Sequence, residues 1–190
     1  MSSTIVAIST PVGEGGIGIV RCSGKECLAM ANALFQRPHG KKLSVKDHRY
    51  LDYGHLYDQD GLMVDEVLCV YMKSPHTYTT EDMVEIHCHG GQVAVTRVLK
   101  VLLREGARLA EPGEFTKRAF LNGRLDLAQA EAVIDLIHAN SDRGYDMSLG
   151  QLGGRLTAAI EDFREKVTEL LAYIEADIEF PEDELERLNK

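Results

Sequence analysis

Residues 112–132 mark the place where this 190-residue sequence changes from one pattern to another. Before them, short apolar runs are separated by Gly, Pro and polar turns, which is typical of strands joined by loops. After them, apolar residues recur at steps of three and four, which is typical of helices. The change predicts an α+β domain over residues 1–113, with a mixed or antiparallel sheet and helices, followed by the first part of an α-helical domain over residues 114–190.

Strands are predicted where β-branched and aromatic residues gather between turn residues, and helices where apolar residues follow helical spacing. In the first domain this predicts helices over 24–35 and 92–105 and strands over 4–9, 17–22, 49–57, 64–72, 83–87 and 107–110. Ser23 followed by Glu26 has the pattern of a capping box, so we expect Ser23 to cap the first helix. The strands on either side of the turn at 58–61 are expected to form a hairpin.

Residues 114–140 are expected to form two short helices. The first spans 114–121 and ends at Asn122-Gly123, a pair typical of turns. The second follows Asp126, a residue type that caps helices well. Asn140-Ser141 then interrupts the chain, and Ser141 is expected to cap the helix that follows.

A long helix is predicted after Ser141. Its apolar residues from Leu149 to Ile178 form one stripe, which needs a partner helix from this chain or from another subunit. The glycines at 150, 153 and 154 each cost a helix up to ~1 kcal/mol relative to Ala, and they mark either a break or a close helix contact. Pro181 is expected to end the helix. Residues 182–190 start an element with nothing to pack against, so we expect the chain to be a fragment.

The net charge of -9 argues against this chain alone binding a phosphate backbone, which requires a basic face. Most of the negative charge lies in residues 141–190, which carry 13 Asp or Glu against 6 Lys or Arg. No apolar run approaches the ~20 residues of a membrane helix. The N-terminus has no basic segment followed by an apolar core, so we expect a cytoplasmic protein without a membrane partner.

Two features could be mistaken for sites. The Gly-rich run at 13–18 leads into another strand, whereas a dinucleotide fingerprint opens a helix, and Ile19 and Glu26 do not fit a P-loop. We interpret the run as a hairpin connection. The cysteines form no CxxC pair, which excludes a zinc knuckle or a thioredoxin-like motif. We expect free thiols, buried at Cys69 and Cys88.

His87-Cys88-His89 suggests a metal site, but the geometry of a strand argues against one. His87 and His89 share a face while Cys88 points the other way, so the three cannot bind one metal without a bend. We therefore predict no metal site here, and no catalytic residue in the chain. Glu85 lies on the same face as the histidines, near a Gly-Gly turn, where a carboxylate can meet a ligand.

Arg21 is expected at the end of the second strand, and Arg124 in a break between two helices. Either arginine alone is more simply explained as a surface residue. Together with Glu85 in one cleft, they could bind an anionic tail and a donor-rich heterocycle through charge-assisted hydrogen bonds. Sequence spacing does not show that the three converge.

Several segments together resemble one family, the N-terminal part of the MnmE/TrmE tRNA modification GTPases. The segments are Thr4-Ile5-Val6-Ala7, Thr10-Pro11, residues 15–24, residues 80–85, His89-Gly90-Gly91 and residues 112–132. The block at 112–132 is long and specific, and the resemblance continues to Ile178-Glu179-Phe180-Pro181.

This resemblance implies a fold and a ligand. The family's N-terminal domain is similar to the tetrahydrofolate-binding fold of aminomethyltransferases, binds 5-formyltetrahydrofolate and forms the family's homodimer. Its folate contacts carry over to Arg21, Glu85 and Arg124. Glu85 would accept hydrogen bonds from the N–H donors of the pterin. The arginines would donate hydrogen bonds to the acidic tail or to the formyl oxygen. Arg124 departs mildly from the family pattern, in which Lys is also expected.

The resemblance also implies what the complete enzyme does. With an FAD-dependent partner, MnmG/GidA, it adds an aminomethyl-type group to carbon five of the wobble uridine of certain tRNAs, and the folate supplies the one-carbon unit. GTP, magnesium and potassium ions belong to a GTPase domain, and these residues contain no Walker A motif. We therefore expect that this chain alone neither hydrolyses GTP nor completes the tRNA chemistry.

Three functions stay open for the chain itself. It is a folate-binding, dimer-forming module, a self-contained one-carbon (aminomethyl) transferase, or a purely structural dimerisation scaffold. Folate-dependent turnover by the chain alone would distinguish the second. Weaker folate binding by an Arg21→Ala or Glu85→Ala variant that still folds would separate the first from the third.

Overall fold

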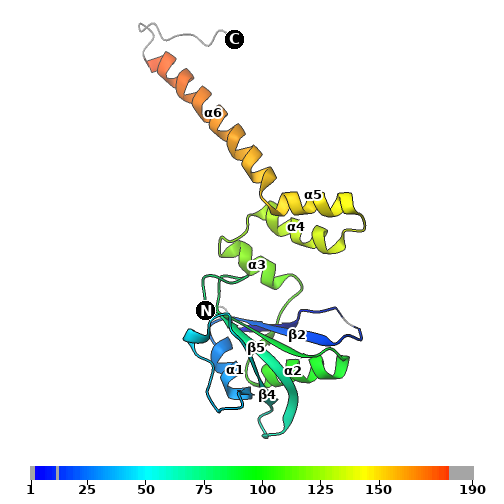
Figure 1. The fold of residues 1–190 in the computed structure, drawn as a ribbon. Helices are drawn as coiled ribbons and strands as arrows, with labels where there is room; N and C mark the ends of the chain where they lie inside the picture. The colour runs from blue at the N-terminus through cyan, green and yellow to red at the C-terminus, as the bar shows by residue number, and fades with distance from the viewer. Residues whose placement is uncertain (1–2, 12, 180–190) are drawn as a thin grey trace. The chain divides into compact units, whose positions relative to one another are not determined.

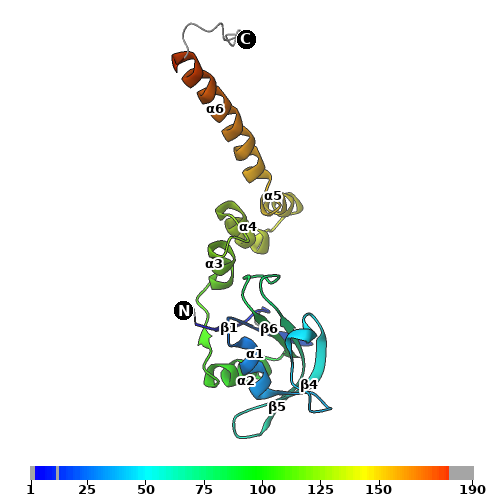
Figure 2. The ribbon, with the colours of Figure 1, turned by 90° about the vertical axis from the view of Figure 1, so that its left-hand side faces the viewer.

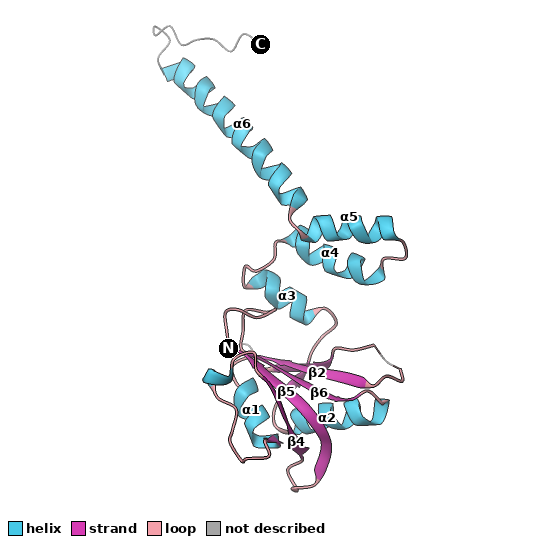
Figure 3. Cartoon of the chain, viewed as in Figure 1, coloured by secondary structure: helices cyan, strands magenta, loops and turns pink. Residues whose placement is uncertain are grey.

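The structure is a computed structural model that describes residues 3–11 and 13–179. Its internal contacts divide the chain into two compact units, Met1–Leu125 and Asp126–Lys190, and each unit is described by itself. The first unit is built around a sheet, and the described part of the second consists of helices (Figures 1 and 3). This arrangement confirms the predicted α+β class with an α-helical portion after it.

Within residues 3–11 and 13–125, the sheet of the first unit has seven strands in the order β3-β4-β5-β6-β2-β1-β7. Their bounds are β1 Ile5–Ile8, β2 Ile17–Ser23, β3 Phe35–Gln36, β4 Leu51–Tyr57, β5 Met63–Met72, β6 Met83–His89 and β7 Arg108–Leu109. All neighbours are antiparallel except β1 and β7, which are parallel. The sheet is therefore mixed, and β4 and β5 form the expected hairpin.

Two helices, α1 (Cys27–Leu34) and α2 (Gln92–Arg104), pack against one face of the sheet (Figure 2). The strand residues on this face alternate with partly exposed ones, as the two-residue period of a strand requires. Val20 and Cys22 of β2, for example, join Val84 and Ile86 of β6 in the buried apolar core. A 3-10 turn, η1 (Val45–Asp47), precedes β4.

The opposite face of the sheet carries the residues between these core positions. In one row across the strands, Arg21 of β2 is paired with Glu85 of β6, and Glu85 with Val70 of β5. Leu51 of β4 continues this row and is 52% exposed. The face is therefore open to solvent in part, and it presents apolar, charged and aromatic side chains together.

The first helix begins later than the capping-box pattern predicts. Its N-cap is Glu26, which makes no side-chain capping bond, and Ser23 is the last residue of β2. Ser23 is fully buried, and its hydroxyl bonds to Thr79 and Glu81 instead of to the helix. The expected Ser23 cap is wrong because long-range partners from the 74–82 loop bind the hydroxyl.

The helix α3 (Glu114–Leu121) lies with the first unit. The sequence-based boundary between residues 113 and 114 placed it with the helical portion, so the division of the chain differs by twelve residues, after Leu125 instead of after Gly113. The physical reason is that α3 packs into the first unit through Glu114 and Arg118, which are both buried.

The second unit contains α4 (Leu127–His138), α5 (Asp142–Leu152) and α6 (Arg155–Glu179). Asp126 forms a capping box with Gln129 at the start of α4, and the Ser141 hydroxyl accepts from the Gly144 N–H at the start of α5. Both caps agree with the sequence prediction. Asp126 also accepts a hydrogen bond from the Thr157 hydroxyl of α6, and this bond lowers the pKa of its carboxyl.

The single long helix predicted after Ser141 is instead two helices. The chain breaks between α5 and α6 at Gly153 and Gly154, and Gly154 has a φ of +84° that favours glycine. Of the two readings of the glycines, the break is the correct one. Much of the apolar stripe is exposed on α6, as at Phe163 and Ile178. The expected stop at Pro181 and the element at 182–190 lie outside the described residues.

Within the described residues, no helix is long and apolar enough to cross a membrane.

Candidate functional site

Arg21 and Glu85 lie directly opposite each other on neighbouring strands. The Arg21 Nε donates a hydrogen bond of 2.7 Å to the Glu85 Oε1, and the two side chains are 30% and 16% exposed. The cross-strand register of β2 and β6 makes this pair, because opposite residues of an antiparallel ladder have neighbouring side chains. Each side chain therefore holds the other in place on the open face of the sheet.

Arg124 follows α3 and reaches the same neighbourhood through Tyr78. Its guanidinium carbon lies 4.8 Å from the centre of the Tyr78 ring, and its Nη1 donates to the Tyr78 carbonyl at 3.2 Å. The Arg21 guanidinium carbon lies 5.6 Å from the centre of the same ring. The ring's electron-rich faces attract both cations. Arg21 and Arg124, far apart in the sequence, thus meet at one aromatic ring, and Glu85 joins them through its hydrogen bond to Arg21.

Two aromatic residues of this site were not among the residues that the sequence singled out. Tyr78 lies in the loop between β5 and β6, and Phe115 lies in the first turn of α3, with its ring centre 5.8 Å from the Arg21 guanidinium carbon. The Tyr78 hydroxyl shares a hydrogen bond of 2.8 Å with Thr116. A tyrosine in a loop that is otherwise rich in Ser, Thr and charged residues was the signal that could have identified Tyr78.

His87 faces Glu85, and its Nε2 lies 3.6 Å from the Glu85 Oε2. His89 instead pairs with Asp65 of β5 at 2.7 Å, and that hydrogen bond raises the pKa of the imidazole. Cys88 points into the core. The three residues have separate environments, and in the described part of the chain no group of three or more His, Cys, Asp or Glu side chains could hold a metal ion.

All four cysteines are buried free thiols. Burial raises the pKa of Cys22 to about 12 and that of Cys88 to about 11. Burial also raises the pKa of Cys27 and Cys69. A thiol with a raised pKa is a weak nucleophile at neutral pH, so the thiols act as small apolar side chains of the core.

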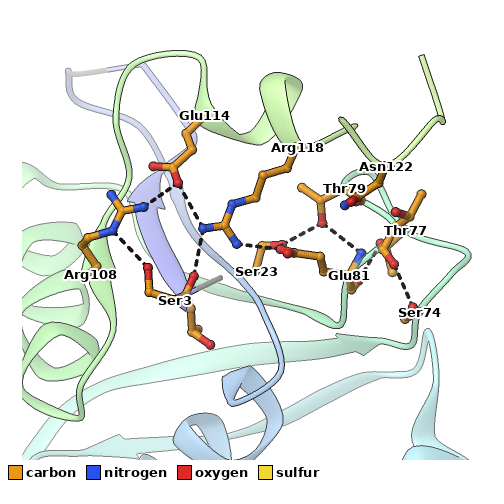
Figure 4. Close-up of polar contacts among 12 residues, drawn as sticks. Ser3, Ser23, Ser74, Thr77, Thr79, Glu81, Arg108, Glu114, Arg118 and Asn122 are labelled. Atoms are coloured by element: carbon orange, nitrogen blue, oxygen red, sulfur yellow. Dashed lines mark hydrogen bonds and ion pairs between the residues drawn. The ribbon is translucent and has the colours of Figure 1, made fainter. Parts of the chain in front are cut away.

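A buried ionic network holds α3 and the 74–82 loop beside the sheet. Figure 4 shows Arg118 between two carboxylates, Glu114 on one side and Glu81 on the other. The Arg118 Nη1 donates to Glu81 at 2.7 Å, and its Nη2 donates to Glu114 at 3.0 Å and to the Ser3 carbonyl at 2.8 Å. A buried guanidinium needs such partners, because an unpaired buried charge costs several kcal/mol.

Glu114 accepts hydrogen bonds through both carboxylate oxygens. Oε1 accepts from Arg108 and Arg118, and Oε2 accepts from the Glu111 N–H at 2.8 Å. Burial opposes the charge, but these hydrogen bonds outweigh it and lower the pKa of Glu114 to about 2. The carboxylate is therefore charged at neutral pH and fixes the first turn of α3, from which Phe115 projects.

The loop itself is held by hydroxyl groups. Ser23 at the end of β2 bonds to the Thr79 hydroxyl at 2.7 Å and donates to Glu81 at 2.8 Å. Asn122, at the end of α3, donates to the Thr79 carbonyl at 2.7 Å (Figure 4). These bonds fix the backbone just after Tyr78 and just before Arg124, and they support the aromatic ring and the arginine.

The glycine-rich segment serves packing in this structure. It connects β1 and β2, which are antiparallel neighbours, as expected for a hairpin connection. A side chain at Gly90 would place a Cβ 2.2 Å from the Gly15 carbonyl oxygen. The segment at 13–16 thus lies against the turn after β6, and this close approach requires a glycine at position 90.

An open pocket of about 590 Å³ begins at Tyr78 and Arg124 and extends towards Arg49 and His76. A smaller pocket of about 200 Å³ lies on the open sheet face beside His87, Leu68 and Tyr53. A further pocket of about 430 Å³, at Arg37 and Asp52, contains none of Arg21, Glu85 and Arg124. The site is therefore an open surface with pockets at its edges.

Comparison with known proteins gives two family matches. Residues 4–124 match the family model described as the GTP-binding protein TrmE N-terminus, and residues 127–190 match the MnmE helical domain. The two matches meet where the contacts divide the chain into its two units.

Relatives named tRNA modification GTPase MnmE cover nearly the whole chain. The protein of Bacillus licheniformis is 54% identical over 187 residues, which are 97% of this chain and 41% of the relative. The protein of Bacillus subtilis is 51% identical over 187 residues, which are again 97% of this chain and 41% of the relative. The protein of Alkaliphilus metalliredigens is 50% identical over 189 residues, which are 99% of this chain and 41% of the relative. The chain thus spans about two fifths of the length of these relatives.

Proposed function

The chain belongs to the family of the tRNA modification GTPase MnmE, and from this we propose that its first unit binds 5-formyltetrahydrofolate as a one-carbon donor for tRNA modification. The observation that carries the proposal is the meeting of Arg21 and Arg124 at the Tyr78 ring, with Glu85 hydrogen-bonded to Arg21. Two cations, one carboxylate and an aromatic ring provide contacts for each part of a folate.

The carboxylate suits the pterin. A pterin presents amino and ring N–H donors along one edge, and a carboxylate is the side chain that accepts most hydrogen bonds. The Glu85 Oε1 accepts the hydrogen bond from the Arg21 Nε, while the Oε2 lies 3.6 Å from the His87 Nε2 on the open sheet face. Glu85 is held by Arg21 and is partly exposed, so it can accept from a ligand without a large rearrangement.

The aromatic rings and arginines suit the rest of the molecule. Tyr78 and Phe115 both lie within 6 Å of the Arg21 guanidinium, which makes a surface against which a flat ring can stack. Arginine binds carboxylates through paired N–H donors, and Arg124 stands at the pocket edge, where the glutamate of a folate would emerge. The residues present therefore fit the cofactor.

We further infer that the first unit forms the homodimer expected of the family. The sheet face that carries Arg21 and Glu85 also exposes large apolar side chains, with Ile17 64% and Leu51 52% exposed. An apolar face beside the proposed folate site supports association with a second copy.

The activity of the whole relatives is also a proposal for this chain. It concerns the modification of carbon five of the wobble uridine in tRNA, with an FAD-dependent MnmG/GidA-type partner, in the cytoplasm. GTP hydrolysis with magnesium and potassium ions is assigned to the parts of the relatives that this chain does not cover. Neither a GTP site nor a catalytic residue is assigned to these 190 residues.

Calorimetric titration of the chain with 5-formyltetrahydrofolate tests the proposal. Glu85→Gln keeps the side chain's shape and removes its charge, so we expect binding to weaken about tenfold or more, as for the loss of a hydrogen bond to a charged group. The matched control is Glu26→Gln, an exposed carboxylate at the N-cap of α1 that makes no capping bond. This control should bind as the unchanged chain does.

Light scattering on the same samples gives the mass and separates the alternatives. A folded dimer that binds no folate would contradict the folate proposal and favour the purely structural dimerisation scaffold. Folate consumption by the chain alone, without other proteins, would instead favour the self-contained transferase. Equal binding by the Glu85 and Glu26 variants would show that Glu85 is not a ligand contact.

A further inference from the structure

The pocket of about 590 Å³ beside Tyr78 has an unusual composition for this chain. Arg49, His76 and Arg124 line it together with Tyr78 and Asn122, and no Asp or Glu is among the described residues that line it. The chain as a whole carries a net charge of -9. A pocket lined by two arginines and no carboxylate is therefore a local exception, and it favours an anionic ligand.

The two arginines are held in place without neutralising partners. Arg49 Nη2 donates to the His76 carbonyl at 2.8 Å, and Arg124 Nη1 donates to the Tyr78 carbonyl at 3.2 Å. Neither arginine has an ion pair within 4.0 Å in the described part of the chain. Each guanidinium therefore keeps its charge and several N–H donors for a ligand, because arginine has five donors and each bond to a carbonyl uses only one.

The backbone of this pocket is also exceptional. Arg49 has a φ of +64° and Thr80 a φ of +61°, and these two are the non-glycine residues with a left-handed backbone in the described ranges. Both line this pocket. Such conformations are costly, above all for a β-branched residue such as Thr, and they tend to lie at binding sites where the surroundings hold them. Here the Ser74 hydroxyl donates to the Thr80 carbonyl at 2.7 Å.

The surroundings define the direction that a bound chain can take. One end of the pocket is Tyr78 and Arg124, which belong to the proposed folate site. A neighbouring pocket shares Thr80 and Asn122 and contains Lys25 together with the carboxylates Glu81 and Asp82, of which Glu81 is paired with Arg118. No carboxylate is among the described residues that line the pocket at Arg49, so an acidic chain that starts at Arg124 is attracted more strongly towards Arg49.

We propose that this pocket binds the γ-linked glutamate chain that extends a folate beyond its first glutamate, with Arg49 as the contact for a later carboxylate. The proposal rests on the proposed function, because it places the folate head at Arg21 and Glu85. It adds a second binding region, and it assigns Arg49 a role in selecting polyglutamylated over monoglutamylated folate. The ligand class is a short polycarboxylate, which matches charged N–H donors spaced along an open pocket.

The test compares the monoglutamate and tetraglutamate forms of 5-formyltetrahydrofolate by calorimetry on the same chain. We expect the tetraglutamate form to bind about tenfold more tightly, a difference of about 1.4 kcal/mol. We expect Arg49→Gln to remove most of this preference while monoglutamate binding changes less than about twofold. The preference should also shrink as salt is added, because the arginines are exposed to solvent.

Lys46→Gln is the matched control. Lys46 is an exposed cation on η1, three residues before Arg49, and it does not line the pocket. This variant removes the same charge from the same segment, so it should keep the tetraglutamate preference. If Lys46→Gln and Arg49→Gln reduce the preference equally, net charge alone explains it and the assignment of the pocket is wrong.

The other outcomes separate this inference from the proposed function. Equal binding of both forms would overturn the inference and leave the folate site intact. Arg49-dependent binding of the tetraglutamate form, with no binding of the monoglutamate, would support the pocket and count against the folate head site. Binding of neither form would overturn both. Arg49-dependent binding of a short RNA, with no tetraglutamate preference, would assign the pocket to phosphodiesters instead.

Discussion

Glu114 offers a quantitative test of how α3 is attached to the sheet. Its carboxylate accepts from Arg108, Arg118 and the Glu111 N–H, and the residue is 8% exposed. These contacts lower the pKa from an ordinary value of 4.5 to about 2. The difference corresponds to about 3 kcal/mol of stability at neutral pH.

The sign of the pH dependence follows from the lower pKa in the folded state. The unfolded carboxyl binds a proton near pH 4.5, and the folded one only near pH 2. The contribution of Glu114 is therefore complete above about pH 5, and it is lost as the pH falls through the window between these two values. Acid should weaken the attachment of α3 in this window.

Glu114→Gln removes the charge and keeps the shape. An amide has one acceptor oxygen, so it cannot accept from the guanidinium groups on one side and from the Glu111 N–H on the other. We expect the free energy of unfolding at pH 7 to fall by about 3 kcal/mol. For a chain of this size, that corresponds to a lower Tm by about 6–12 °C.

The assay is urea unfolding followed by circular dichroism at pH 7 and at pH 2.5, with Glu26→Gln as the control. Other carboxyls titrate in the same range, so the informative quantity is the difference between the unchanged chain and the variant at each pH. This difference should be large at pH 7 and much smaller at pH 2.5. A loss below about 0.5 kcal/mol at pH 7, or an equal loss at both pH values, would refute the reasoning.

Three further predictions concern the site and its support. Gly90→Ala should destabilise the first unit by about 1–3 kcal/mol in urea unfolding, since the added Cβ would meet the Gly15 carbonyl oxygen. Gly91→Ala should destabilise it much less, because a Cβ at that position has open space around it. Tyr78→Ala should weaken 5-formyltetrahydrofolate binding more than Tyr78→Phe does in calorimetry, because only Phe keeps the ring beside the arginines; equal losses would count against a role for the ring. The NMR titration of His89 should show a pKa above 6.5 that falls in Asp65→Asn; this pair stabilises the fold below pH 6.5, and its contribution is lost as the pH rises through the folded pKa.

Much of the fold of both units could be predicted from local sequence patterns. The order of strands and helices, the hairpin of β4 and β5 and the caps at Asp126 and Ser141 depend on residues within a few positions of each other. Ser23 shows the limit of such reasoning. Its capping-box pattern is local, but Thr79 and Glu81, more than fifty residues away, bind its hydroxyl instead.

The candidate site likewise depends partly on local sequence patterns and partly on contacts between distant segments. Residue types identified Arg21, Glu85 and Arg124 as a possible set, and strand alternation placed Glu85 and His87 on one face. The grouping around Tyr78 depends on the cross-strand register and on the bonds that hold the 74–82 loop to α3. Neither the register nor these bonds can be read from spacing along the chain.

By itself, the sequence determined the class of the fold, the places where most strands and helices form and the family to which the chain belongs. The fold class and the elements follow from backbone preferences and apolar periodicity, which act over a few residues. The family follows from the specific motifs that the chain shares with it. Only the tertiary structure decided that α3 joins the first unit, that the long helix predicted after Ser141 breaks at Gly153–Gly154 and that Arg49 and Arg124 share one pocket. The burial of Glu114 and Arg118 and the lining of a pocket are properties of packing between distant segments, so they exist only once the chain is folded.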